Sequence, residues 1–153
     1  MKTLKIEIPE GFQIENFDQK TGLIKFTATP KDITERIKDF ADVLSYHNIS
    51  NDEFEKYCQN LSDDEIAYKQ IKLIVAALNE GWVPDWQDSD QYKYYPWFDM
   101  DDSSSSGRFS FLCSVSQDSS SGVGSRLCFK SRELCEFAAT TFLAFYKRFH
   151  VIQ

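Results

Sequence analysis

Apolar and polar residues alternate in the first and last parts of the chain, which is the pattern of half-buried strands. Near the N-terminus the alternation runs through residues 4–8, 12–14 and 23–28, with turn-forming residues between these segments, and it predicts a small hairpin or meander. In the second half, residues 108–116 (RFSFLCSVS) form the clearest strand pattern, and residues 125–130 (SRLCFK) predict another. One face of the clearest strand is expected to meet the core: Phe109, Phe111, Cys113 and Val115.

Between these two regions, helical spacing of apolar residues predicts three helices. Each begins at a pair of residues with the spacing of a capping box: Asp32 with Glu35, Ser50 with Glu53, and Ser62 with Glu65. The first helix carries its apolar stripe from Ile33 to Leu44, and the third, residues 63–80, is the most apolar and is expected to be central. Gly81 stands where a left-handed C-terminal cap is needed. A last amphipathic helix is predicted to begin at Ser131.

Together these elements predict an α+β fold in a single domain, residues 1–153, because this length suits one core. We divide the chain into an N-terminal β-hairpin region (1–30), a helical pair (31–61), and a helix, three-stranded meander and helix (62–153). The expected sheet is small and antiparallel, and α-helices pack against it.

Composition narrows the classes of function. The net charge of −7 repels a phosphate backbone, which disfavours direct nucleic-acid binding. No apolar run approaches the roughly 18 residues of a membrane span and no signal-like segment opens the chain, so we expect a cytoplasmic protein outside the membrane. The four cysteines form no CxxC pair, which argues against a zinc site or a redox motif: Cys58, Cys113, Cys128 and Cys135.

An aromatic stretch, residues 81–100, separates the helical part from the strand-rich part and contains all three tryptophans. Tryptophan and tyrosine supply large contact areas with a polar edge, so the stretch supplies our candidate binding residues. These are Trp82, Trp86, Tyr92, Tyr94, Tyr95 and Trp97. Strand alternation puts Tyr95 and Trp97 on one face, and we expect this pair to form a partly exposed binding surface. Trp82 and Trp86 are expected to pack between the central helix and the sheet.

No catalytic or cofactor motif stands out in the chain. Residues 88–99 place acids at three positions of a calcium loop, but Lys93 stands where that loop requires glycine. Asp99, Asp101 and Asp102 have two interpretations. They are either solvated turn residues or the oxygen ligands of a looser metal site. His47 and His150 lie near predicted helix ends, where capping and dipole effects explain them. We therefore assign no catalytic residue, no metal ligand and no cofactor.

Three segments carry a resemblance to a known family: GWVPDW (81–86), QYKYYPWF (91–98) and GSRLCFKSRELCEFA (124–138). With them the chain resembles a family of uncharacterised small proteins from gut anaerobic bacteria and their phages, and IEIPEGFQI (6–14) is similar to a module at the start of such proteins. The resemblance implies no activity and no site residues. It implies an origin in phage or mobile elements, where small acidic proteins often act by binding another protein.

Three functions remain open. We expect a non-enzymatic accessory protein that uses its aromatic residues on a protein partner or on a second copy of itself. A carbohydrate or small-ligand binding module is the first alternative, because stacked aromatic rings with nearby aspartate and glutamine side chains can hold polar rings. An acidic DNA-mimic inhibitor is the second, and it requires aspartates and glutamates along one continuous face.

Overall fold

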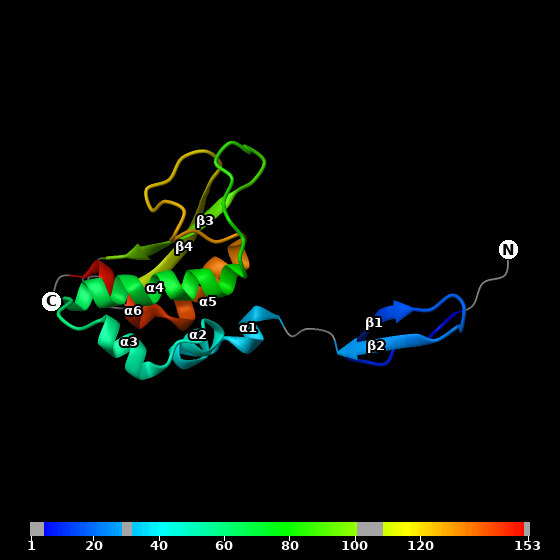
Figure 1. Ribbon diagram of the computed structural model, residues 1–153. Coiled ribbons are helices and arrows are strands. Elements are labelled where there is room, and N and C mark those ends of the chain that lie inside the picture. The colour runs from blue at the N-terminus through cyan, green and yellow to red at the C-terminus, as the bar shows by residue number, and fades with distance from the viewer. Residues whose placement is uncertain (1–4, 29–31, 101–108, 152–153) are drawn as a thin grey trace. The chain divides into compact units, whose positions relative to one another are not determined.

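The computed structural model describes residues 5–28, 32–100 and 109–151 of the chain. Helices and small antiparallel sheets make it an α+β protein with an N-terminal β-hairpin, which confirms the predicted fold class (Figure 1). The chain divides into two compact units, residues 1–32, here called the hairpin unit, and residues 33–153, here called the main unit. This boundary lies close to the predicted end of the N-terminal region at residue 30.

The hairpin unit contains strands β1 (Phe12–Phe17) and β2 (Ile24–Ala28), which pair antiparallel as predicted. The turn between them is held by the Asp18 carboxylate, which accepts hydrogen bonds from the N–H of Lys20 (2.8 Å) and the hydroxyl of Thr21 (2.7 Å). The strand predicted at residues 4–8 is wrong over its described part, because residues 5–8 pair with neither strand. Alternation in sequence does not by itself supply a pairing partner.

The first predicted helix of the main unit is broken into two, α1 (Ile33–Arg36) and α2 (Phe40–Tyr46). The cause is a second capping box: the Asp39 carboxylate accepts from the N–H of Asp42 (2.9 Å), and the Asp42 carboxylate accepts from the N–H of Lys38 (2.8 Å). Because this box starts a new helix, the backbone leaves helical geometry at residues 37–39.

The next two helices begin where the sequence predicts, as α3 (Asn51–Tyr57) and α4 (Asp63–Asn79). The Glu53 and Glu65 carboxylates accept hydrogen bonds from the N–H groups of Ser50 and Ser62, each at 2.8 Å. Helix α4 contacts α2, α5 and α6, so it is the central helix of this unit. It ends in two left-handed residues, Glu80 (φ 50°) and Gly81 (φ 82°).

Strands β3 (Lys93–Asp99) and β4 (Ser110–Gln117) form the second antiparallel sheet. Their register shifts after Trp97, which pairs with Cys113, because Phe98 pairs with Phe111 and Leu112 is the extra residue of a bulge. The bulge reverses the alternation. Cys113, predicted to face the core, is therefore exposed, and Ser114 is buried in its place.

The predicted third strand at residues 125–130 is reduced to a single bridge, in which Tyr94 and Phe129 exchange two backbone hydrogen bonds (3.0 and 2.7 Å). The neighbouring hydrogen-bonded pair of such a ladder would need an N–H at Pro96, which has none. On the edge of this segment that faces away from β3, the Asn79 side chain donates to the Cys128 carbonyl and accepts from the N–H of Lys130. These backbone groups are then bonded to the end of α4.

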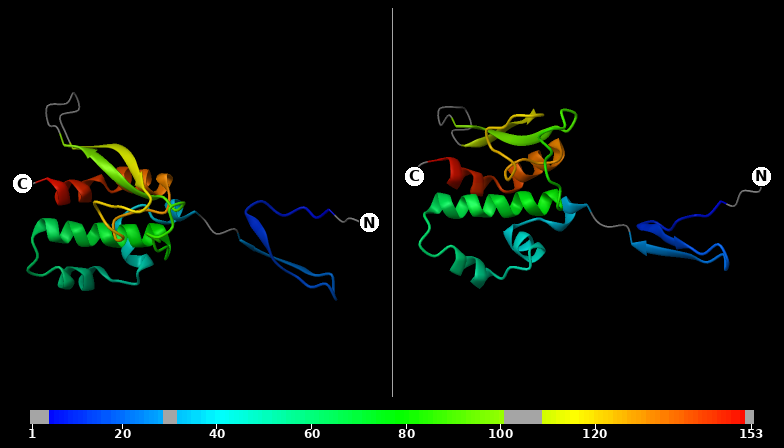
Figure 2. Two further views of the ribbon diagram at one scale, coloured as in Figure 1. Left: turned by 90° about the horizontal axis from the view of Figure 1, so that it is seen from above. Right: turned by 45° about the horizontal axis from the view of Figure 1, so that its top comes forward.

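The predicted last helix begins at the Ser131 cap but divides at Phe142 into α5 (Arg132–Thr141) and α6 (Leu143–His150). Figure 2 shows the layers of the main unit: the β3–β4 sheet lies on α5 and α6, α4 lies beneath these helices, and α3 lies beyond α4. The core forms between the layers, with Ile71, Ile74, Phe129 and Phe142 fully or almost fully buried. Among the described residues, no helix is long and apolar enough to cross a membrane.

Candidate binding groove

The structure separates the six aromatic residues that the sequence singles out. On β3, Tyr95 is only 8% exposed, whereas Trp97 is 55% exposed. The expected binding surface of Tyr95 with Trp97 is therefore not formed. Tyr92 is exposed ahead of the strand, and Tyr94 lies on the side of α5, where the Arg132 guanidinium is 5.6 Å from its ring centroid.

Tyr95 is buried because loops close over its face of β3. Lys93, on the same face, is fully buried, and its ammonium group donates to the carbonyl oxygens of Asp118 (2.8 Å) and Asp88 (3.2 Å). The ammonium also lies 5.3 Å from the ring centroid of Trp86, whose Nε1 donates to the Ser125 hydroxyl (2.7 Å). Trp86 thus joins two loops over the sheet and does not pack between the sheet and the central helix.

Trp82 is the predicted site residue that borders a half-open groove of about 760 Å³ in the main unit. The groove runs between α3, the middle and end of α4, and the segments around residues 82 and 125. Its apolar lining includes Ile49, Phe54, Tyr57, Leu73, Trp82 and Val83. Two of these are strongly exposed, Tyr57 at 67% and Val83 at 76%. Exposed apolar residues gathered at one groove mark a contact surface.

The charged residues of the groove are mostly cationic, in a chain whose net charge is −7. They are Lys69, Lys72 and Arg126, against the single acid Glu53. The Glu53 carboxylate is already engaged by Ser50, whose N–H and hydroxyl donate to it at 2.8 Å each, and these bonds lower the pKa of Glu53. The Lys69 ammonium lies 4.0 Å from the ring centroid of Tyr57, so a positive charge sits directly on the apolar lining.

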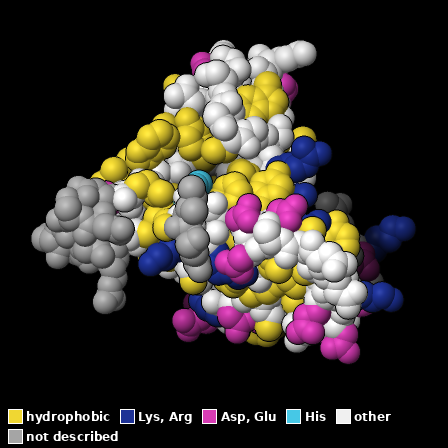
Figure 3. Space-filling view, turned by 90° about the vertical axis from the view of Figure 1, so that its left-hand side faces the viewer, with side chains coloured by type: hydrophobic (Ala, Val, Ile, Leu, Met, Phe, Trp, Pro, Cys, Tyr) yellow, Lys and Arg dark blue, Asp and Glu magenta, His cyan; other side chains and the backbone are white. Residues whose placement is uncertain are grey.

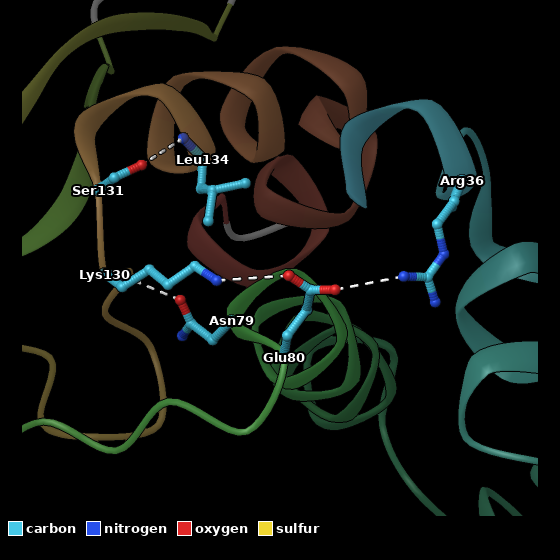
Figure 4. Close-up of polar contacts among 6 residues, drawn as sticks. All are labelled: Arg36, Asn79, Glu80, Lys130, Ser131 and Leu134. Carbon is cyan, nitrogen blue, oxygen red and sulfur yellow. Dashed lines mark hydrogen bonds and ion pairs between the residues drawn. The ribbon is translucent and has the colours of Figure 1, made fainter. Parts of the chain in front are cut away.

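The wall that carries Trp82 is fixed by the end of α4. Glu80 and Gly81 turn the chain through left-handed geometry, and the N–H of Trp82 donates to the Asn79 carbonyl (2.9 Å). Figure 4 shows the Glu80 carboxylate between the Arg36 guanidinium (3.2 Å) and the Lys130 ammonium (3.4 Å). These contacts tie α1, α4 and the segment before α5 together beside the groove.

The groove residues 125–126 are followed by a segment that is bonded to the Asn79 side chain. The Asn79 amide donates to the Cys128 carbonyl (2.8 Å) and accepts from the N–H of Lys130 (3.0 Å), as part of Figure 4 shows. Asn79 is buried, so these bonds are shielded from water. The groove is therefore built on the core, with its walls fixed from inside.

Sequence reasoning found Trp82 but missed the rest of the groove. Tyr57 lies on α3 with the buried Phe54, but its own side chain is exposed to solvent. Lys69 and Lys72 are three residues apart on α4, a spacing that puts two cations on one side of a helix. That spacing was the one available signal, and it does not show which other elements face the two lysines.

The described residues form no cluster suited to metal binding. No group of three or more His, Cys, Asp or Glu side chains among them could hold a metal ion, and Asp101 and Asp102 of the looser predicted set lie outside the described ranges. The His47 ring nitrogen Nε2 is 2.9 Å from the Leu73 carbonyl. Burial raises the pKa of the Cys128 thiol, and raises that of the Cys135 thiol to about 12, which disfavours the nucleophilic thiolate.

The acidic surface is not continuous on the face shown in Figure 3. Acidic side chains gather in its lower part, but basic and hydrophobic side chains lie among them, and hydrophobic ones dominate above. A DNA mimic needs carboxylates in regular succession along one face. This face of the protein therefore does not offer that arrangement.

Comparisons with known proteins add no relative. The chain matches no protein-family model, no curated protein and no solved structure.

Proposed function

We propose that this chain is a non-enzymatic binding protein that holds an acidic, apolar segment of a partner protein in the groove beside Trp82. One observation carries the proposal: exposed apolar side chains and three cations line the same groove, which has a volume of about 760 Å³. An occupant must match both features. A segment with large apolar side chains on one side and carboxylates at its edges does so.

The apolar part of the groove supplies the driving force. Tyr57, Trp82 and Val83 present partly or largely exposed side chains around the deeper Phe54 and Leu73. Covering them removes apolar surface from water, which contributes roughly 25 cal/mol for each Å². Tryptophan and tyrosine are also the residue types that most often dominate binding energy at protein interfaces.

The cations supply selectivity for charge. Lys69, Lys72 and Arg126 give the groove a positive edge, while Glu53 is compensated by its bonds to Ser50. A carboxylate-bearing segment meets opposite charge here, whereas the −7 net charge of the chain repels it elsewhere. The local field therefore directs an acidic partner to this groove.

A carbohydrate ligand fits the groove less well. Sugars need several convergent hydrogen-bonding groups, but the lining is mainly apolar, and the buried amide of Asn79 is already bonded to the Cys128 carbonyl and the Lys130 N–H. A small apolar anion has the right chemistry and is the competing occupant. The half-open form of the groove favours a polypeptide segment, which can extend beyond it.

The setting that we propose comes from the resemblance carried by residues 81–86, 91–98 and 124–138. It is that of a cytoplasmic accessory protein of phage or mobile-element origin, in which binding one host or phage protein is a sufficient function. Both the setting and the partner are part of the proposal.

The proposal is tested with a fluorescein-labelled peptide of Leu, Phe and Glu, about 15 residues long, and a counterpart in which every Glu is Lys. We expect saturable binding of the acidic peptide, measured by fluorescence anisotropy, with an affinity about tenfold or more above that of its counterpart, because three edge charges together contribute about 1.4 kcal/mol or more. Equal affinities for the two peptides would refute the assignment of charge selectivity.

Two tryptophan variants locate the binding. Trp82→Ala should weaken binding of the acidic peptide, whereas Trp97→Ala, which removes an exposed tryptophan outside the groove, should leave it unchanged. If Trp97→Ala weakens binding as much as Trp82→Ala, the groove is not the site. Binding of dodecanoate without binding of the peptide would assign the groove to a small ligand and overturn the proposal.

A further inference from the structure

Two helix faces line the groove beside Trp82. The lining residues of α4 include a row that recurs every three or four positions, which places them on one side of the helix: Lys69, Lys72, Leu73, Ala76 and Asn79. At a rise of 1.5 Å per residue, this row is about 15 Å long. Helix α3 contributes Glu53, Phe54 and Tyr57. An occupant of the groove therefore lies along two helices.

These two helices are not packed closely on each other. In the described chain, the elements that pack closely on α4 are α2, α5 and α6. Helix α3 belongs to a small apolar cluster with Phe54 and Cys58, against which Leu73 of α4 packs. An apolar floor between two helices that are not packed together is a suitable place for a third helix, whose side chains interdigitate with theirs.

The backbone of the occupant also favours a helix. An extended segment has N–H and C=O groups that need partners, which the edge of a sheet commonly supplies. Among the described residues that line the groove, none belongs to a strand, and the Asn79 amide is already bonded to the Cys128 carbonyl and the Lys130 N–H. A helix bonds its own backbone groups, so it covers the apolar floor without leaving them unpaired.

The two cations of α4 have a matching spacing. Lys69 and Lys72 are three residues apart, which is close to one helical turn. On a partner helix, carboxylates three or four residues apart also lie on one side. Such a pair of carboxylates meets both ammonium groups of α4, while the apolar side chains of the same helix face the floor at Phe54 and Leu73.

We propose that the groove binds its partner segment as an amphipathic α-helix, with two carboxylates one turn apart that face Lys69 and Lys72. This inference rests on the proposed function and adds the conformation and the charge spacing of the bound segment. The row on α4 corresponds to about three turns of the partner helix. Its apolar residues recur every three or four positions along these turns.

The conformation is tested with a fluorescein-labelled peptide of about 15 residues. Leu and Phe recur in it every three or four positions, two Glu lie four positions apart at the edge of this stripe, and Ala fills the outer side. A second peptide carries Pro in place of one central outer Ala, which interrupts a helix but keeps every charge and apolar side chain. In anisotropy titrations with the full chain, we expect the proline peptide to bind at least about tenfold more weakly.

A direct readout accompanies the affinities. When the peptide without proline is isotope-labelled and bound to the full chain, its Cα chemical shifts in nuclear magnetic resonance spectra should be those of a helix. Shifts of an extended chain, or equal affinities of the two peptides, would refute a helical occupant and leave the proposed function in place. If neither peptide binds, the proposed function fails together with this inference.

The charge spacing is tested by moving one Glu so that the two lie only two positions apart, which takes it to the other side of the helix. We expect wild type to bind this peptide about threefold more weakly. Lys72→Met removes one of the two cations and should bind both peptides alike, whereas Lys147→Met, outside the groove, should keep the difference. Equal affinities in wild type would contradict the pairing of carboxylates with Lys69 and Lys72.

Discussion

The Asn79 side chain, in the last turn of α4, accepts a hydrogen bond from the backbone N–H of Lys130 at 3.0 Å, 51 positions further along the chain. The same amide donates to the Cys128 carbonyl at 2.8 Å. One buried side chain therefore satisfies the backbone groups of residues 128 and 130 on the edge of this segment that faces away from β3. It ties the segment that follows the groove residues Ser125 and Arg126 to the central helix.

Replacing Asn79 should be strongly destabilising. Asn79→Ala leaves the Cys128 carbonyl and the Lys130 N–H without these partners, and we expect a loss of about 2–4 kcal/mol in the free energy of unfolding. The measurement is urea denaturation followed by circular dichroism. Gln59→Ala, at an exposed position, is the control and should change stability by less than about 0.5 kcal/mol. Similar small losses in both variants would show that the amide does not hold this segment.

Glu80 combines a left-handed backbone with two exposed ion pairs, to Arg36 and Lys130. Both Glu80→Ala and Glu80→Gly remove these ion pairs, so their difference isolates the backbone conformation. We expect the glycine variant to be more stable than the alanine variant by about 1 kcal/mol, because only glycine adopts φ near +50° without steric cost. Equal stabilities in thermal or urea denaturation would contradict the geometry at this helix end.

The Arg148 guanidinium joins α6 to the start of α4 through the Asp63 carboxylate, and its Nη1 donates to the Gln70 side chain (3.0 Å). These hydrogen bonds from Arg148 hold the pKa of Asp63 below its ordinary value of 3.8. A carboxyl group with a lowered pKa contributes stability above its unfolded-state pKa, and this contribution is lost as the pH falls through the lower folded-state pKa. Stability should therefore fall with acidification below about pH 4.

Arg148→Met should lower the thermal midpoint at neutral pH and weaken its dependence on acid. Part of that dependence remains, because other carboxyl groups also have a lowered pKa: Asp18, Glu53, Glu65, Asp118 and Glu133. Melting curves at a series of acidic pH values measure both effects. Lys147→Met, at the exposed neighbouring position of α6, should keep the wild-type dependence. A parallel shift of the whole curve in Arg148→Met would argue against the Asp63 contact as the titrating interaction.

Lys93 holds the loops over β3. Lys93→Met removes the hydrogen bonds to Asp88 and Asp118 and the cation beside the Trp86 ring, and it should cost about 1–3 kcal/mol of stability. We expect faster hydrogen exchange of amides in residues 85–91 and 117–124 and easier acrylamide quenching of Trp86. Lys147→Met serves again as the control with an exposed lysine. Unchanged exchange in both loops would show that they close without the ammonium group.

The parts of the fold that depend on local sequence could be predicted. The caps at Ser50, Ser62 and Ser131 lie within three residues of their partners, so their signals are complete in the sequence. The break before α2 was missed because Asp32 with Glu35 and Asp39 with Asp42 have the same spacing, and propensity does not decide between one long helix and two short ones.

The faces of β3 and β4 could not be read from alternation alone. Leu112 is an extra residue only in relation to β3, so the bulge that exposes Cys113 depends on pairing between two strands. The burial of Lys93, on the same face as Tyr95, depends on loops on both sides of the sheet, which provide the carbonyls of Asp88 and Asp118.

The candidate site was predictable only in part. Trp82 follows a recognisable helix end, and the sequence singles it out. Tyr57, Lys72 and Arg126 come from three separate segments, and only the packing of α3 and residues 125–126 around α4 brings them to one groove. No residue spacing in the sequence indicates that these three side chains meet in one groove.

The most direct test of the proposed function is to reverse the charge of the groove. Lys69→Glu combined with Lys72→Glu changes both α4 cations, and Lys20→Glu combined with Lys147→Glu changes net charge equally outside the groove. In anisotropy titrations with the acidic peptide and its lysine counterpart, the groove variant should prefer the lysine peptide, while the control variant keeps the wild-type preference for the acidic one. An unchanged preference in the groove variant would contradict binding of an acidic segment at this site.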